Sequence, residues 1–234
     1  AATAGALLRA AASHGDGVRG TVRITASEVV GVEVLPPILA ALRQAHPELV
    51  IELALSNRID DLLRRDADIA VRMLRPAQEA LVARRIGVIE LGLHARRDYL
   101  ARHGTPSGWD DLRNGHALIG FDQETASIRS LRPKFGMLGR GDFALRADSD
   151  LAQLAAIRAG FGIGICQVGL ARRDAALVRV LPQSFSLPLE TWLAMHEDLR
   201  DSPRCRVVFA ALGTGLADYV GGAGVGPRSG SSAA

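Results

Sequence analysis

The sequence is poor in aromatic side chains, which make up only 4% of its 234 residues. Proteins that hold single-stranded nucleic acids stack the bases on aromatic rings, so the composition argues against that class of protein. Lysine is scarcer still, because Lys134 is the only one among 28 basic residues. The arginines are dispersed and never form a run of five or more basic residues, which indicates a solvated surface rather than a DNA-binding face.

Cysteines and long apolar runs are also rare. The two cysteines, Cys166 and Cys205, form no Cys-x-x-Cys motif, so we expect a reducing compartment and no metal ion. No stretch approaches the roughly 18 consecutive apolar residues of a membrane span. The Ala-rich start lacks both the basic segment and the long apolar core of a signal peptide. We therefore expect a cytoplasmic protein that binds no cofactor.

Strands and helices alternate in the first part of the chain. The apolar run Leu49–Leu55 is near-continuous, as expected for a strand covered on both faces, and Pro36 and Pro37 suit the first turn of a helix. The resulting β-α-β-α-β order predicts a parallel sheet with right-handed crossovers. The expected elements are strand Thr21–Thr25, helix Leu35–Gln44, strand Leu49–Leu55, a short helix over Ile59–Leu63 and strand Asp68–Met73.

Two long extended segments, Leu81–Arg96 and Leu189–Leu199, flank a second α/β region. Such segments between two sheets predict a hinge, and a final helix from Ser202 and Pro203 is expected to pack back on the first region. The elements expected in between are helix Asp98–Arg102, strands His116–Phe121 and Phe143–Ala147, a helix from Leu151 that Asp148 and Ser149 cap and glycines close, and strands Ile163–Cys166 and Val178–Leu181.

Several of these stretches together resemble the effector-binding domain of LysR-type transcriptional regulators. They are the strand from Gly20 with its small polar turn before a Leu-Pro helix, "HPELVIEL", "DADIAVR" and "DSDLAQLAAIRAGFGIGIC". The resemblance runs from about Gly20 to Gly221, although the irregular stretch 122–142 does not align.

The resemblance implies an α/β fold of two Rossmann-like subdomains joined by two crossing strands, which is type-2 periplasmic-binding-protein-like. A small-molecule effector would bind in the cleft between the subdomains, and DNA only through a winged helix-turn-helix expected to be absent from this chain. The family also implies a homo-oligomer, a dimer or tetramer, in which helix Leu35–Gln44 lies beside helix Leu151–Ala159 of another copy. The expected domains are the end of a linker helix (1–19), regulatory subdomain I (20–92 and 193–221), regulatory subdomain II (93–192) and a disordered tail (222–234).

Ligands of open α/β sheets bind at the carboxyl ends of the strands, so the polar side chains there are the candidate effector contacts. Helix N-termini near two of them, Ser27 and Ser149, favour an anion such as a carboxylate, whereas Glu28 would favour a neutral or cationic effector. Simpler roles are open too: both serines can serve as helix caps, Asn57 as a turn residue, and Arg72 as a partner of Glu28 or Asp122. The candidates are Ser27, Glu28, Asn57, Arg72, Met73, Asp122, Gln123 and Ser149.

Two other classes of protein compete with this hypothesis. A solute-binding protein of a transport system would share the fold, but it would need a signal peptide. An enzyme would need catalytic groups, and the sequence has no Gly-x-Ser-x-Gly motif; its Gly160, Gly162 and Gly164 lie between a helix and a strand, the reverse of a dinucleotide fingerprint. We therefore expect no enzyme and no catalytic residues.

Overall fold

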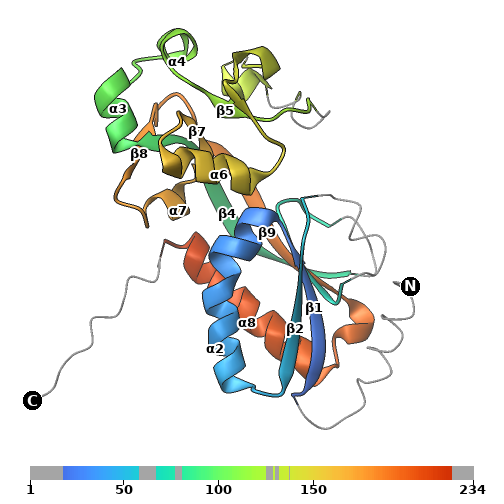
Figure 1. The fold of residues 1–234 in the computed structure, drawn as a ribbon. Coiled ribbons are helices and arrows are strands. Elements are labelled where there is room, and N and C mark those ends of the chain that lie inside the picture. The colour runs from blue at the N-terminus through green and yellow to red at the C-terminus, as the bar shows by residue number, and fades with distance from the viewer. Residues whose placement is uncertain are drawn as a thin grey trace, which may run out of the picture. The chain divides into compact units, whose positions relative to one another are not determined.

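The computed structural model describes residues 18–57, 67–76, 81–124, 129, 132–136 and 138–222. The chain divides into two compact units, unit 1 over 1–88 and 189–217 and unit 2 over 89–188 and 218–234. Both combine strands with helices (Figure 1), so the α/β prediction is confirmed. Among the described helices, none is both long enough and apolar enough to cross a membrane.

Unit 1 is built on a sheet whose central strands are parallel. Strand β1 (Gly20–Ala26) pairs in parallel with β2 (Leu49–Leu55) on one side and with β3 (Ile69–Arg72) on the other. Strand β9 (Leu187–His196) then pairs antiparallel with β3. The parallel pairing of the first three strands confirms the sequence prediction, and their carboxyl ends therefore meet at one edge.

The first helix of unit 1 begins earlier than its apolar spacing predicts. Helical backbone starts at Glu28, passes through the π-helix η2 (Val30–Val34) and continues as α2 (Leu35–Ala45). Pro36 and Pro37 lie at the start of α2, as predicted, and neither can donate the usual helical hydrogen bond. The backbone there widens instead, with the Leu35 N–H bonding to the Val30 carbonyl five residues back.

Helix α8 (Pro203–Val220) begins where Ser202 and Pro203 predicted it, and Glu197–Leu199 before it form a 3-10 turn. It lies beside α2 (Figure 1), and a methyl group added at Gly215 would collide with Ile38. This close approach lets the buried side chains of Val208 and Leu212 close the core of unit 1.

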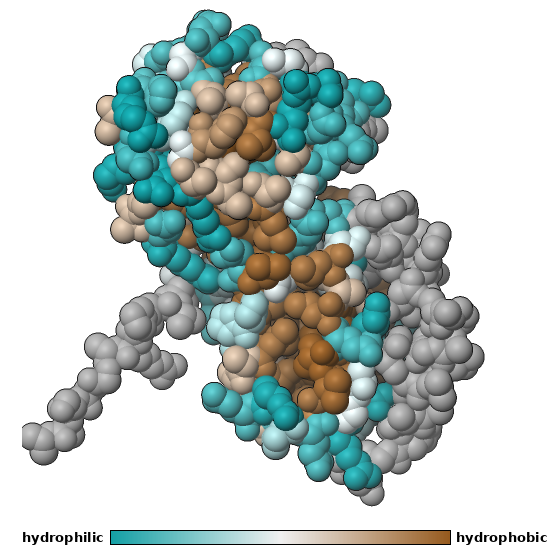
Figure 2. Space-filling model, viewed as in Figure 1, coloured by the Kyte–Doolittle hydropathy of each residue, from teal (hydrophilic) through white to brown (hydrophobic). Residues whose placement is uncertain are grey.

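The expectation that β2 is covered on both faces is wrong. Val50 is 55% exposed, Leu53 38% and Leu55 40%. In the described sheet β2 is the edge strand next to β1. Val50 points to one of its faces and Leu53 and Leu55 point to the other, so the described residues cover neither face completely. Figure 2 shows the resulting apolar surface on the part of unit 1 that carries α2 and β2.

Unit 2 takes its longest strand from β4 (Leu81–Arg96), which matches the predicted bounds and pairs antiparallel with β7 and β8. Strands β5 and β6 form a separate two-stranded parallel sheet, and Leu118 forms an isolated parallel bridge with Ile163. The remaining elements of unit 2 are α3 (Arg97–His103), α4 (Trp109–Gly115), β5 (Ile119–Gly120), η4 (Arg132–Phe135), η5 (Arg140–Asp142), β6 (Leu145–Arg146), α6 (Asp150–Ala159), β7 (Gly164–Gln167), α7 (Val168–Ala171) and β8 (Leu177–Val180).

The structure corrects the sequence predictions for unit 2 in three ways. The strands expected over His116–Phe121 and Phe143–Ala147 shrink to two paired residues each. Ser149 caps α6, but Asp148 does not share that role, because its carboxylate accepts N–H groups from the β5 end instead. The short helices α4 and α7 were not foreseen, since α4 buries only Leu112 and so leaves hardly any apolar periodicity.

The glycine turn after α6 is confirmed. Gly160 closes the helix at φ +77°, a left-handed conformation that glycine adopts without strain. Gly162 follows, and a methyl group there would collide with the Ala117 carbonyl oxygen. The linker helix expected over 1–19, the helix over Ile59–Leu63 and the tail over 222–234 lie wholly or largely outside the described residues.

Candidate functional site

The carboxyl ends of β1 and β2 bring three of the candidate residues together. The Ser56 N–H donates to the Ala26 carbonyl at 2.9 Å, which extends the strand pairing by one residue. The Glu28 N–H then donates to Asn57 Oδ1 at 3.0 Å. Ser27 lies between these two contacts, where the strand passes into the helix. The site therefore joins a helix N-terminus to small polar side chains.

Arg72 at the end of β3 places a buried cation at the same edge of the sheet. The side chain is 7% exposed, and its Nη2 donates to Thr25 Oγ1 at 2.8 Å. Its Nη1 donates to the Val71 carbonyl at 3.1 Å. An arginine keeps its charge in this setting, so the edge carries a fixed positive charge beside the end of β1.

Strand β9 adds side chains that the sequence analysis did not select. Trp192 pairs with Arg72 in the β-sheet register, and the guanidinium of Arg75 lies 5.6 Å from the centre of its ring. Thr191 donates its hydroxyl to the sulfur of Met73 at 3.6 Å. These contacts join residues more than 100 positions apart, so no local sequence signal points to them.

In unit 2 the other three candidates gather around Asp148. Its Oδ1 accepts the N–H of Asp122 at 3.1 Å and the N–H of Gln123 at 2.9 Å. Asp122 in turn forms an ion pair with Arg140 at 2.8 Å, a partner that the sequence analysis missed. Ser149 accepts the Ala152 N–H at 3.4 Å, so a capping role accounts for this contact.

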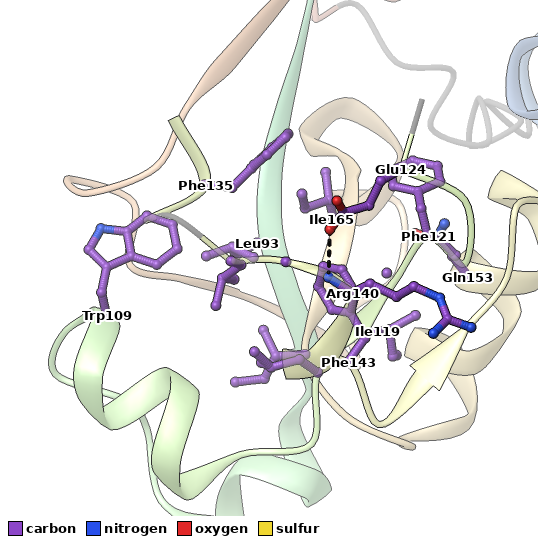
Figure 3. A pocket seen from close by; sticks show the side chains of 15 residues that line it. Leu93, Trp109, Ile119, Phe121, Glu124, Phe135, Arg140, Phe143, Gln153 and Ile165 are labelled. Atoms are coloured by element: carbon purple, nitrogen blue, oxygen red, sulfur yellow. Dashed lines mark hydrogen bonds between the residues drawn. The ribbon is translucent and has the colours of Figure 1, made fainter. Parts of the chain in front are cut away.

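Unit 2 also contains an apolar chamber that the sequence analysis did not foresee (Figure 3). Its volume is about 40 Å³, and branched aliphatic and aromatic side chains make most of its wall. The lining residues come from strands far apart in the sequence and from the irregular stretch 122–142. They are Leu93, Trp109, Leu118, Ile119, Gly120, Phe121, Glu124, Phe135, Leu138, Gly139, Arg140, Phe143, Gln153, Ile163 and Ile165.

Cys166 and His94 form a buried contact between β7 and β4. The Cys166 sulfur lies 3.4 Å from His94 Nδ1, which is also 2.9 Å from the Gly92 carbonyl oxygen. Burial raises the pKa of the Cys166 thiol to about 12, and burial also lowers the pKa of His94. Because a nucleophile needs the thiolate, this pair is a packed structural contact rather than a reactive centre.

Comparison with known proteins gives the family. Residues 15–217 match the family described as the LysR substrate binding domain. The chain is 28% identical over 209 residues to a probable HTH-type transcriptional regulator LtrA from Klebsiella pneumoniae, covering 83% of this chain and 65% of that protein. It is 31% identical over 97 residues to an HTH-type transcriptional regulator from Xanthomonas campestris, covering 42% of this chain and 28% of that protein.

Solved structures agree on the fold. The regulatory domain of CrgA, a LysR-type transcriptional regulator from Neisseria meningitidis, superposes with a TM-score of 0.73 at 23% identity, covering 85% of this chain and 99% of that domain. The predicted type-2 periplasmic-binding-protein-like fold is therefore confirmed.

The chain belongs to the LysR substrate binding domain family, as the sequence motifs implied. Its curated relatives are transcriptional regulators, so a transport solute-binding protein is not favoured. The match spans 28% of the length of the Xanthomonas campestris relative and 65% of the length of the Klebsiella pneumoniae relative.

Proposed function

We propose that this chain senses a small-molecule effector on behalf of a transcriptional regulator. DNA would be bound by a separate helix-turn-helix part, in line with the names of the relatives. Such a regulator acts on DNA, so we also expect it in the cytoplasm. We expect no catalysis from this chain. Effector binding would shift the population of conformations and so change how the DNA-binding parts are held.

The observation that carries this proposal is the polar edge of unit 1. A helix N-terminus at Ser27 and Glu28 faces the end of a parallel sheet, and the buried charge of Arg72 lies on the same edge. N–H groups at a helix start and a fixed guanidinium both favour an anion. A carboxylate is therefore the first effector class to test. Glu28 carries the opposite charge and keeps a neutral or cationic effector as the alternative.

We place Asp122, Gln123 and Ser149 as the contacts that unit 2 contributes to the same effector. They too follow strand ends, and Ser149 begins the longest described helix of unit 2. Asn57 orders the first turn of the unit 1 helix, and Met73 follows Arg72 in the chain. Each of these residues lies near the strand ends of its own unit, which is where ligands of open α/β sheets bind.

A thermal-shift screen of small carboxylates, amino acids, aromatics and sugars tests the proposal. An effector at about 100 times its dissociation constant adds roughly 2.7 kcal/mol to the free energy of unfolding, which raises the melting temperature visibly. Ser27→Ala should abolish most of the shift. Ser184→Ala, an exposed serine of unit 2, should leave it unchanged. A screen in which no compound shifts the melt, or a hit that Ser27→Ala leaves intact, contradicts the assignment.

We also propose that the chain forms a homo-oligomer, a dimer or tetramer, in which an apolar surface of unit 1 takes part. Val32, Leu53 and Leu55 are all at least 38% exposed, and Leu53 and Leu55 point to one face of β2, where Leu55 lies against Gly31, the neighbour of Val32. A large exposed apolar patch marks an interaction surface in soluble proteins. The family resemblance implies that α2 of one copy lies beside α6 of another copy.

A further inference from the structure

We propose that unit 2 holds a second small-molecule site, the apolar chamber between β4, β5 and β7, which takes the alkyl end of a short uncharged amphiphile such as an aliphatic alcohol. This site shares no lining residue with the effector site proposed at the strand ends, although Arg140 of its wall forms an ion pair with Asp122 of that site. Every lining residue belongs to unit 2.

The floor of the chamber is rigid. Leu93 on β4, Ile119 on β5 and Ile163 before β7 are 4%, 3% and 1% exposed, and the pairing of these strands fixes their positions. Side chains so deeply buried hold one rotamer and interdigitate with their neighbours. The chamber therefore keeps its shape without a ligand.

Aromatic rings make the opposite wall. Trp109 and Phe135 both pack on Phe185, with ring centres 6.2 Å and 5.4 Å apart respectively. Gly136 lies against the Trp109 ring, and a Cβ atom at Gly120 would come within 2.5 Å of the Phe143 ring. Because Gly136 and Gly120 have no side chains, the rings of Trp109 and Phe143 pack directly against the backbone. The space beside these two rings therefore stays open.

The size and polarity of the chamber select the ligand. Its 40 Å³ is several times the roughly 10–15 Å³ that one water needs, yet the aliphatic and aromatic wall gives water few hydrogen-bond partners. Apolar surface entering such a space leaves bulk water, which is favourable. The volume accommodates a few methylene groups, so an alkyl end fits better than a ring system.

Polar side chains at one side of the chamber set the preferred head group. Figure 3 shows Glu124, Arg140 and Gln153 on one side, away from Trp109 and Phe135. The backbone N–H of Arg140 donates to Glu124 Oε1 at 3.0 Å, and the Arg140 guanidinium is paired with Asp122 at 2.8 Å. The carboxylates of Glu124 and Asp122 outnumber the single guanidinium of Arg140, so the net charge at this side is negative and repels an anionic head group. A hydroxyl is uncharged and can hydrogen-bond to the same side chains. The preference is thus opposite to the carboxylate favoured in unit 1.

Titration of 1-pentanol and pentanoate, followed by NMR of isotope-labelled isoleucine methyl groups, tests the proposal. We expect 1-pentanol to shift the methyl signals of Ile119, Ile163 and Ile165 and to show contacts from its own methyl protons to them. Pentanoate should bind at least tenfold more weakly. Ile165→Phe fills the chamber and should raise the dissociation constant of 1-pentanol at least tenfold. Val178→Phe makes the same kind of change on β8, outside the lining, and should leave it within twofold.

Three results would overturn the proposal. One is the absence of contacts between 1-pentanol and the three isoleucines in the unaltered protein, which needs no variant. Another is pentanoate binding as tightly as the alcohol. The third is equal weakening by Ile165→Phe and Val178→Phe, which would mean a general loss of structure. Ser27→Ala should leave the dissociation constant of 1-pentanol within twofold of the value for the unaltered protein. The chamber proposal can therefore fail or hold independently of the effector proposal.

Discussion

Gly162 and Gly108 show how differently two glycines constrain this chain. A methyl group at Gly162 would collide with the Ala117 backbone oxygen, because the turn after α6 brings the two segments into contact. Around Gly108 nothing lies within 4 Å of an added Cβ atom. A backbone oxygen moves only with its strand, so the first collision is not relieved by a rotamer change.

We expect Gly162→Ala to lower the free energy of unfolding by about 2 kcal/mol or more, because overpacking against the backbone forces β7 and the segment before β5 apart. Gly108→Ala is the matched control and should change it by less than about 0.5 kcal/mol. Urea unfolding of the two variants beside the parent measures both. Equal effects of the two substitutions would show that the turn tolerates a side chain.

His94 makes the stability of the protein depend on pH. Burial lowers its pKa below the ordinary 6.5, so the folded protein holds it neutral where the unfolded chain takes up a proton. The unfolded state then binds more protons, and the free energy of unfolding falls as the pH drops from 6.5 toward the lower folded pKa. The stabilisation is complete above 6.5.

Urea unfolding between about pH 7.5 and about pH 5 should therefore show a decline that His94→Asn reduces. The variant is expected to be less stable throughout, so the slope against pH rather than the absolute value is the readout. His116, whose pKa burial also lowers, supplies part of the remaining slope. An unchanged slope in His94→Asn would mean that other groups govern the acid sensitivity.

Among the secondary-structure elements, the start of the first helix of unit 1 has the most unusual backbone. The helix starts at Glu28, whose N–H donates to Asn57 Oδ1. It is widened into a π-helix at Val30–Val34, directly before Pro36 and Pro37, which lack the backbone N–H groups of a regular helix. π-Helical segments are rare and occur frequently at functional sites. This one directly follows the polar turn at Ser27, so the unusual backbone and the candidate site coincide.

Ser149→Ala should cost about 0.5–1 kcal/mol of stability, because Ser149 caps α6 through a long hydrogen bond of 3.4 Å. Ser184→Ala, which removes an exposed hydroxyl, should be close to neutral. Thermal unfolding of both variants provides the comparison. A loss far above 2 kcal/mol would mean that the Ser149 hydroxyl holds more than the helix end.

At the scale of the whole molecule, the chain passes between the two units within β4, near the start of β9 and within α8. The last crossing adds Tyr219 to unit 2, where it donates to Gln167 at 2.5 Å and lies 4.9 Å from the guanidinium of Arg173. The sequence analysis foresaw the two extended crossings. The hydrogen bond from Tyr219, near the end of α8, to Gln167 joins side chains 52 positions apart, so no local sequence pattern predicts it.

The proposed oligomer predicts that Leu53→Lys weakens self-association at least tenfold, because it places a charge in the exposed apolar surface of β2. Leu74→Lys is the control, since Leu74 is 58% exposed but follows β3 instead. Sedimentation equilibrium over a range of concentrations measures the dissociation constants. A chain that is monomeric at every concentration, or two variants that weaken association equally, contradicts the proposed surface.

Elements that depend on local patterns could be predicted from the amino-acid sequence. The bounds of β2 and β4, the start of α8 and the left-handed glycine after α6 follow from apolar runs, proline and glycine, which act on neighbouring residues. The family, too, could be recognised from such stretches, because the motifs that carry it are contiguous.

Which faces and side chains meet depends on the packing of the folded chain and could not be predicted. The exposure of β2, the Arg72–Thr25 contact, the grouping of Asp122 and Gln123 around Asp148 and the chamber behind β5 all join residues distant in sequence. An apolar run looks the same in a central strand and in an edge strand, since its position depends on which strands pair with it. Pairing is set by the burial of the whole core, and no short stretch of sequence contains that information.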